Sequence, residues 1–278
     1  MKKKFGIGII GCGEIAAAHG RAYRALADDC DIIAMSDTVE AMAKHRAQEF
    51  EVETIYTNYH DLLADPRVDA VAICTPHYLH APMTIAAANA GKHVLVEKPM
   101  CMNVGEVQEM IYAAKKNGVR LTMSTEQVNP RHRFIKEHIL PEIGNISFSF
   151  LVDFYYRSMA YYEKARWRGT WAREGGGIFC NQSIYTWDTF QWLLGGVDVA
   201  YGYWANLLHP NIEVEALVIV SAKRLNAPVV PRSVRAIFCA NFCRNDQNDD
   251  RGRSRGYWLW ACQVSQWNAW QDFRNQYL

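Results

Sequence analysis

The chain has 278 residues, of which 50% are hydrophobic and 21% are charged, and its formal net charge is +1. This composition is globular and excludes a disordered chain, and the length is enough for one large core or two moderate ones. The near-neutral charge gives no reason to expect nucleic acid or an anionic membrane as a partner, so neither is predicted.

The 8 cysteines are scattered along the chain, and no CxxC pair occurs. Cys12, Cys74 and Cys180 fall in or beside apolar segments, where a free thiol acts as a small hydrophobe. The sequence therefore predicts no disulfide framework and no metal site, and it favours a reducing, cytoplasmic compartment. No run reaches the ~20 apolar residues that a membrane helix requires.

A strand, a glycine-rich turn and a helix are predicted at the start of the chain. Phe5–Ile10 is an apolar run that favours a strand, and residues 11–16 read Gly-Cys-Gly-Glu-Ile-Ala, a match to GxGxxA. Apolar residues at three- and four-residue spacing then indicate a helix over 16–26. This strand–turn–helix context is the one in which a GxGxxA pattern binds a dinucleotide.

Each turn residue has a physical role in that interpretation. Gly11 permits the tight turn, Gly13 lets a pyrophosphate approach the backbone, and the small Ala16 allows close packing of helix on strand. Glu14 and Ile15 lead into the helix, whose N-terminus offers free N–H groups and the positive end of the helix dipole to the phosphates, so both are expected to contact the cofactor. We therefore expect this turn to bind the cofactor.

A second strand over residues 32–35 ends at Ser36 and Asp37. Asp37 lies about twenty residues past the glycine turn, where an acidic side chain hydrogen-bonds the adenosine ribose 2′-OH. A carboxylate there repels a 2′-phosphate, so NAD is favoured over NADP, although NADP stays possible. The alternative is an ordinary helix N-cap before Val39, and both roles can hold together.

Strands and helices then alternate. Helical patterns end at residues 50, 63, 90 and 117, and strand patterns cover residues 54–56, 69–74, 93–96 and 120–124. This alternation predicts an α/β fold with a doubly wound parallel sheet.

Two strand ends carry candidate site residues. Thr75, Pro76 and His80 follow the buried strand over 69–74, and we interpret this loop as a cofactor contact rather than a metal site. The apolar run at 94–96 ends in Glu97-Lys98-Pro99, which places Lys98 where open α/β sheets bind ligands. The alternative is a solvated lysine before a turn proline.

Taken together, these motifs resemble the Gfo/Idh/MocA family of oxidoreductases. The resemblance spans roughly residues 5–215 and rests on the glycine turn, the loop over 75–80, the segment 90–94 and Glu97-Lys98-Pro99. It implies NAD(P)-dependent hydride transfer to or from sugars, polyols and their derivatives. It also implies that Lys98 is the active-site lysine, that the Lys98–Pro99 peptide is cis, and that Glu97 contacts the cofactor.

The same resemblance implies how the chain is organised. It implies an N-terminal Rossmann domain over residues 1–125 and a C-terminal α/β domain over 126–278, with an open, mostly antiparallel sheet. In the family that sheet forms one wall of the active site and often an oligomer interface, so a homo-oligomer is expected.

A helix is predicted over 178–194, capped by Gly195, after a run of three glycines. Asn181 and Tyr185 are four residues apart, which would place them on one helix face. The family usually has a polar or acidic residue and a histidine at these positions. Tyrosine in place of histidine resembles the glucose–fructose oxidoreductase-like members rather than the inositol dehydrogenase-like ones.

The resemblance implies Lys98, Tyr185 and Asn181 as catalytic residues, with proton handling by Lys98 and Tyr185, and it implies substrate contacts by these residues and Arg168. A phenol near pKa ~10 can fall by ~1–3 units beside an ammonium, so Tyr185 beside Lys98 could exchange a proton with a substrate oxygen. The alternative for Tyr185 is a packed aromatic, and Asp188 is either an orienting carboxylate or a surface acid.

The composition changes after Glu215, because no glutamate occurs in the 63 residues that follow it. Such a change is typical of an out-of-frame reading, so we expect a frameshifted or otherwise aberrant C-terminus starting between residues 216 and 230. Disorder or poor packing over 232–278, and an incomplete second sheet, would follow. A divergent but genuine tail is the alternative.

The leading prediction is thus an NAD(P)-dependent oxidoreductase acting on a sugar, cyclic polyol or related hydroxy or keto compound. The alternative is a non-catalytic nicotinamide-binding sensor or scaffold, which keeps the glycine turn without an acid–base pair. An S-adenosylmethionine methyltransferase shares the glycine turn but does not explain Glu97-Lys98-Pro99.

Overall fold

The computed structural model divides the chain into two compact units, of which the first ends at Ser124 and the second contains Met102–Val104 and the residues from 125 onward. Each unit is described by itself. The structure describes residues 4–124, 129–144, 146, 149–153, 155–194, 199–206, 209, 211–215, 217–223, 246–248 and 254–261.

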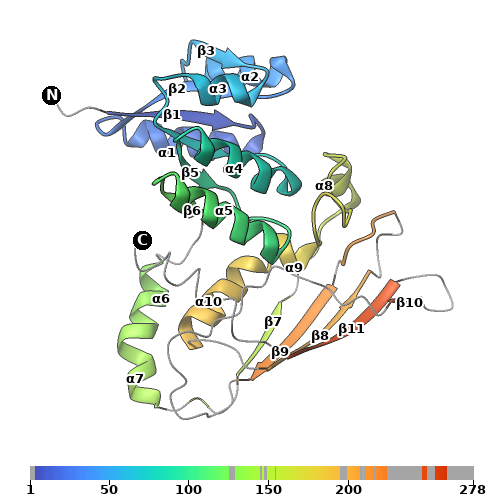
Figure 1. Cartoon of the computed structure of the whole chain (residues 1–278). Coiled ribbons are helices and arrows are strands. Elements are labelled where there is room, and N and C mark those ends of the chain that lie inside the picture. Colours follow the sequence, from blue (N-terminus) through green and yellow to red (C-terminus); the bar gives the residue numbers. More distant parts are fainter. Residues whose placement is uncertain are drawn as a thin grey trace. The chain divides into compact units, whose positions relative to one another are not determined.

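The first unit is built on a six-stranded parallel sheet in the order β3-β2-β1-β4-β5-β6 (Figure 1). Its strands are β1 (Phe5–Ile10), β2 (Cys30–Ser36), β3 (Thr54–Tyr56), β4 (Ala70–Ile73), β5 (His93–Val96) and β6 (Leu121–Met123). The order reverses direction between β1 and β4, which is the point where doubly wound sheets bind ligands. The predicted parallel α/β sheet is confirmed.

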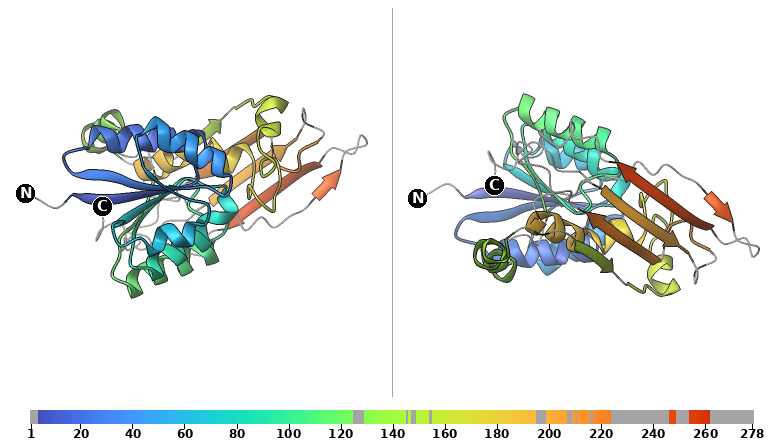
Figure 2. Two further views of the ribbon diagram at one scale, coloured as in Figure 1. Left: turned by 90° about the horizontal axis from the view of Figure 1, so that it is seen from above. Right: turned by 90° about the horizontal axis from the view of Figure 1, so that it is seen from below.

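Helices cover both faces of this sheet. They are α1 (Glu14–Ala25), α2 (Glu40–Glu49), α3 (Tyr59–Ala64), α4 (His80–Asn89) and α5 (Val104–Lys116), with a 3₁₀ turn at His77–Leu79. Figure 2 shows α1 and α2 on one face and α4 and α5 on the other. Because both faces are covered, the central strands are nearly continuous apolar runs, as the sequence indicated.

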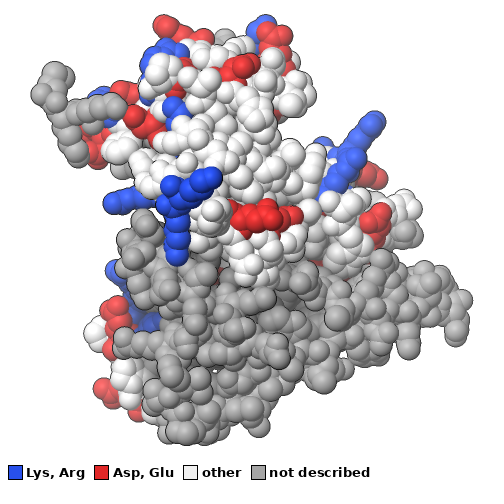
Figure 3. Space-filling model, viewed as in Figure 1, with Lys and Arg blue, Asp and Glu red and all other residues white. Residues whose placement is uncertain are grey.

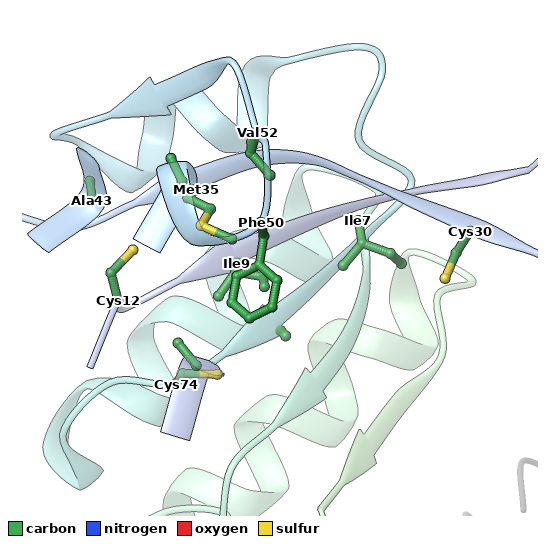
Figure 4. Packing of buried hydrophobic residues seen from close by; sticks show 12 residues of the cluster. Ile7, Ile9, Cys12, Cys30, Met35, Ala43, Phe50, Val52 and Cys74 are labelled. Carbon is green, nitrogen blue, oxygen red and sulfur yellow. The ribbon is translucent and has the colours of Figure 1, made fainter. Parts of the chain in front are cut away.

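The core on the α1 and α2 face is centred on the ring of Phe50, which lies beside Ile9 of β1 (Figure 4). Gly20 of α1 packs directly over this ring, since a Cβ at that position would lie 2.5 Å from two atoms of the Phe50 ring. The glycine therefore allows α1 to approach the sheet closely, and this fixes the helix that follows the glycine turn.

In the second unit the structure describes five strands in the order β10-β11-β8-β9-β7, and neighbouring strands pair antiparallel. They are β7 (Ser149–Asp153), β8 (Val199–Ala205), β9 (Leu217–Lys223), β10 (Asp246–Asn248) and β11 (Ser254–Ala261). The helical segments are α6 (Pro130–Phe134), a π-helical turn (Ile135–Ile139), α7 (Leu140–Ile143), α8 (Met159–Glu163), α9 (Ile178–Asn181) and α10 (Ile184–Leu194).

The single helix predicted over 178–194 is wrong, because α9 and α10 are separated at Gln182 and Ser183. The Ser183 N–H donates to the Ile178 carbonyl, five residues back, at 2.9 Å. An α-helix has hydrogen bonds to the carbonyl four residues back, so this five-residue bond interrupts the α-helical pattern and ends α9 before α10 begins. Asn181 and Tyr185 therefore do not share one continuous helix. The predicted cap, Gly195, lies outside the described residues.

The disorder expected over 232–278 does not hold for Ser254–Ala261, which pairs with β8 along its whole length. This segment contains Tyr257, Trp258 and Trp260, and aromatic residues favour strands. Residues 232–245, 249–253 and 262–278 lie outside the described residues, so the expectation of disorder or poor packing stays a prediction there.

On the face shown in Figure 3, described side chains of both charge signs are present. Of the helices that the structure describes, none has the length and apolar character needed to cross a membrane.

Candidate active site

The glycine turn lies between the carboxyl ends of β2 and β4. The Gly11 N–H donates to the Ser36 carbonyl at 2.7 Å, and the Gly11 backbone has a φ of +90°. A Cβ on Gly11 would lie 2.8 Å from the Cys74 carbonyl oxygen. Both the backbone conformation and the close contact require glycine at this position.

Gly13 is the N-cap of α1 and has a different environment. No atom lies within 4 Å of the place where its Cβ would be, so a substituent there would project into open space. The first-turn N–H groups of α1, at Glu14 and Ile15, begin beside this space, and both side chains are exposed. Open space next to a helix N-terminus fits the pyrophosphate of a dinucleotide.

Asp37 follows β2 and connects it to the glycine turn. Its Oδ2 accepts the Cys12 N–H at 2.8 Å, and its Oδ1 accepts the Val39 N–H at 2.9 Å. Helix α2 begins at Glu40 with Val39 as its N-cap, so the alternative interpretation of Asp37 as the N-cap is wrong, and the residue forms a turn before the helix. Each carboxylate oxygen keeps acceptor capacity for a ribose hydroxyl.

Arg46 of α2 supports the glycine turn, and the sequence did not indicate this role. Its guanidinium donates to the Gly13 carbonyl at 3.0 Å and pairs with Glu49, and the residue is only 8% exposed. A helical arginine is usually solvated, so no pattern in the sequence distinguishes this one.

The Glu97-Lys98-Pro99 segment lies at the carboxyl end of β5, and the Lys98–Pro99 peptide is cis, as the resemblance implied. Lys98 is half-buried and Glu97 is buried. Glu97 Oε1 accepts a hydrogen bond from His19 Nε2 at 2.7 Å, and its Oε2 accepts the Lys98 N–H at 3.1 Å.

The charge state of Glu97 follows from these contacts. Burial alone would raise its pKa, but the hydrogen bond from His19, the Lys98 N–H and the nearby charges outweigh burial, so the pKa lies below its ordinary value. Glu97 is therefore an anion at neutral pH.

The loop after β4 brings Thr75 and Pro76, both half-buried, to the same sheet edge. His80 is fully buried, and its ring nitrogens lie 2.7 Å from the Pro99 carbonyl and 2.8 Å from the Thr75 carbonyl. The predicted contact between His80 and the cofactor stays a prediction. No metal-binding group of His, Cys, Asp and Glu occurs in the described part of the chain.

In the second unit, Asn181 belongs to a buried polar network. Its Nδ2 donates to Glu174 Oε1 at 2.8 Å and to Tyr161 Oη at 3.1 Å. Arg168 also contacts the Tyr161 hydroxyl, and it lies 3.6 Å from Glu174 Oε1. The structure thus brings Asn181 and Arg168 together. Tyr161 and Glu174 were not predicted as site residues, although the position of Glu174 directly before the three glycines is visible in the sequence.

Tyr185 and Asp188 are half-buried residues of α10. Lys98 belongs to the first unit, whereas Arg168, Asn181 and Tyr185 belong to the second, and each set is positioned within its own unit. The pairing of Lys98 with Tyr185 therefore stays a prediction.

Glu215 is a second buried carboxylate, and no pattern in the sequence predicted its role. It is 1% exposed, and its Oε1 accepts the N–H groups of Gly177 at 2.8 Å and Phe179 at 3.1 Å. Burial raises its pKa to about 7, although the backbone hydrogen bonds oppose the shift. Glu215 thereby holds the start of α9, the helix that carries Asn181.

Family models of known proteins match both parts of the chain. A model described as the oxidoreductase family with an NAD-binding Rossmann fold matches residues 5–125, and a model of the GFO/IDH/MocA C-terminal domain matches residues 116–230. The uncharacterized oxidoreductase YrbE of Bacillus subtilis is 32% identical over 213 residues, which are 76% of this chain and 60% of YrbE. The chain thus spans less than two thirds of the length of YrbE.

Myo-inositol 2-dehydrogenase of Thermotoga maritima is 30% identical over 239 residues, which cover 84% of this chain and 69% of that protein. Among solved structures, the WlbA dehydrogenase from Bordetella pertussis in complex with NADH and UDP-GlcNAcA has a TM-score of 0.71 at 30% identity, over 79% of this chain and 67% of that chain. Given these matches and the glycine and lysine turns at one sheet edge, the chain belongs to the Gfo/Idh/MocA family of oxidoreductases.

Proposed function

We propose that this protein is an NAD-dependent oxidoreductase that transfers a hydride between nicotinamide and a sugar, a cyclic polyol or a related hydroxy or keto compound. The observation that carries the proposal lies within the first unit. The glycine turn after β1 and the lysine turn after β5 lie at the carboxyl ends of strands on either side of the point where strand order reverses. A cofactor site and a reactive amine are thus built on one sheet edge.

The residues present fit NAD. The open space at Gly13 and the N-terminus of α1 accommodate a pyrophosphate, and Asp37 supplies an acceptor for the adenosine ribose. The carboxylate of Asp37 disfavours a 2′-phosphate, so NAD is preferred to NADP. When bound, the nicotinamide supplies the hydride donor or acceptor. Thr75 and Pro76 are proposed to contact the cofactor from the loop after β4.

This chain's own residues would handle the proton. An alcohol must lose a proton as it becomes a carbonyl, and a carbonyl must gain one in the reverse direction. We assign that task to Lys98 and Tyr185, with the Lys98 ammonium polarising the substrate oxygen and favouring the phenolate of Tyr185. Asn181 and Arg168 would hold substrate hydroxyl groups, since the buried network with Glu174 and Tyr161 fixes both side chains.

The proposal also includes the sheet of the second unit, the cellular compartment and the oligomeric state. The antiparallel strands of the second unit would form an open, incomplete wall against the substrate. The protein would work in the cytoplasm, since its described cysteines are free thiols. It would assemble into a homo-oligomer, which analytical ultracentrifugation would show as a mass above the 31.8 kDa of one chain.

The direct test is titration of the protein with NADH and NADPH, followed by turnover assays on a panel of sugars and polyols. We expect tighter binding of NADH and reduction of NAD by at least one compound in the panel. Cofactor binding without turnover of any compound would favour a non-catalytic nicotinamide sensor or scaffold. Absence of NADH binding would exclude both.

A further inference from the structure

Two buried side chains and one largely buried side chain surround the turn that carries Lys98, and hydride transfer itself does not require any of them. They are His19 of α1, Glu97 at the end of β5 and His80 in the first turn of α4. We propose that these three residues form a bracket that positions Lys98, and that they act through Lys98 rather than by touching substrate or cofactor. The role of Lys98 rests on the proposed function above.

One side of the bracket holds the backbone of Lys98 itself. The two carboxylate oxygens of Glu97 are divided between two donors, His19 Nε2 at 2.7 Å and the Lys98 N–H at 3.1 Å. The side chains of His19 and Glu97 are 12% and 10% exposed, so water competes little for these contacts. A charge-assisted hydrogen bond at this burial is stronger than an exposed one.

The other side of the bracket holds the residue after Lys98. His80 Nδ1 lies 2.7 Å from the Pro99 carbonyl, and His80 Nε2 lies 2.8 Å from the Thr75 carbonyl. Carbonyl oxygens only accept hydrogen bonds, so the neutral ring donates to one of these two carbonyls and only the protonated ring donates to both. Burial lowers the pKa of His80 and favours the neutral ring. The ring thus lies between the lysine turn and the loop after β4, and side chains contact the backbone at the Lys98 N–H and at the Pro99 carbonyl.

The bracket connects the lysine to the two segments proposed to bind NAD. His19 lies on the helix whose N-terminus faces the pyrophosphate space, and Thr75 lies in the loop beside the cofactor edge. A displacement of α1 is therefore transmitted to the Lys98 turn through His19, and a displacement of the loop after β4 is transmitted through His80. This explains why Glu97 and His80 lie at the cofactor edge although their polar atoms already have protein partners.

The test compares Glu97→Gln and His80→Gln with the matched control His93→Gln. His93 lies at the opposite end of β5, where its Nδ1 accepts the Arg120 N–H at 3.0 Å, so the control also removes a histidine hydrogen bond from the same strand. Misplacement of a catalytic group by about 1 Å can cost on the order of 10²-fold in rate. We expect kcat to fall by about 10- to 100-fold in both bracket variants, with NADH affinity and KM within about 3-fold of wild type.

A second measurement does not depend on turnover. Reductive ¹³C-methylation labels the lysines, and the Lys98 signal is identified by its absence in Lys98→Arg. We expect this signal to shift in Glu97→Gln and His80→Gln and to stay unchanged in His93→Gln. Glu97→Asp keeps the carboxylate, so its Lys98 signal should lie closer to the wild-type position than that of Glu97→Gln.

An unchanged Lys98 signal in both bracket variants, or an equal shift in the His93 control, would overturn the proposal. A shift of the expected kind in a protein that turns over no substrate would leave the bracket standing and refute the proposed function alone. A weakening of NADH binding by more than 10-fold with kcat unchanged would show that Glu97 and His80 serve the cofactor directly, and would also overturn it.

Discussion

At the residue scale, the sequence predicted the position of Asp37 but not its hydrogen bonds. Its spacing from the glycine turn predicted an acidic side chain at the end of β2, and the structure has it there. The sequence did not show that both carboxylate oxygens accept backbone N–H groups, from Cys12 and Val39. That arrangement depends on two chain segments meeting, which one-dimensional spacing does not encode.

Asp37→Asn tests the role of the charge. The amide has nearly the same shape and one acceptor oxygen but carries no negative charge, so it repels a 2′-phosphate less. We expect the ratio of NADPH to NADH dissociation constants to fall by about 10-fold, equivalent to roughly 1.4 kcal/mol. Fluorescence titration with both cofactors measures this ratio, and an unchanged ratio would remove Asp37 from cofactor selection.

Glu215 gives a pH prediction for the stability of the fold. Its pKa is about 7 in the folded protein against an ordinary value of 4.5, so the folded state keeps a proton that the unfolded state releases between these two pH values. The stabilisation is fully present below pH 4.5 and is lost as pH rises to about 7. By the linkage relation this amounts to about 3 kcal/mol.

Glu215→Gln should remove that dependence. We expect the denaturation midpoint of the wild type to fall relative to the variant as pH is raised from 4.5 to 7. Urea unfolding of both proteins at matched pH values measures the difference in their stability. Groups that do not interact with Glu215 titrate alike in both proteins and do not contribute to this difference. Parallel curves would mean that Glu215 has an ordinary pKa.

At the element scale, apolar periodicity predicted the strands and helices of the first unit, because each element there buries one face or both against its neighbours. It failed at α9 and α10, which it predicted as one helix. The interruption follows from the Ser183–Ile178 hydrogen bond and from Glu174 holding Asn181, and contacts between distant residues leave no periodic signal.

The glycine turn allows a matched pair of substitutions. Gly13 has φ −72° and open space at its Cβ position, so Gly13→Ala should fold with stability within about 0.5 kcal/mol of wild type. Its methyl group would enter the space assigned to the pyrophosphate, and we expect NADH binding to weaken by at least about 10-fold. Isothermal titration alongside thermal unfolding separates the two effects.

Gly11→Ala should behave differently. At φ +90° and 2.8 Å from the Cys74 carbonyl, a methyl group strains the backbone and displaces the end of β4. We expect a loss of roughly 1–3 kcal/mol of stability as well as a loss of binding. Equal stability of the two variants would contradict this account of the turn.

At the scale of the whole molecule, the two units differ in how well the sequence predicted them. The family model of the second unit ends at residue 230, within the stretch where the composition changes, and the matched regions cover 60% of YrbE and 69% of the Thermotoga maritima dehydrogenase. Strand β11 nevertheless pairs with β8, so part of the late sequence enters the sheet. Composition identified the change but not which residues after it still form a strand.

The frameshift hypothesis is tested by reading the gene. We expect a different reading frame, entered between codons 216 and 230, to encode alternating strands like those of the family. If no other frame encodes such strands, the tail is a genuine divergent sequence and the hypothesis fails.

The central claim is that Lys98 takes part in hydride transfer at a site built on the NAD-binding sheet edge. The most direct measurement is the turnover of wild type and Lys98→Ala with NAD and the best substrate of the panel, alongside NADH titration of both proteins. We predict a fall in kcat/KM of about 10²- to 10⁴-fold in the variant, with the NADH dissociation constant within about 3-fold. Equal kcat/KM values for the two proteins would contradict the account.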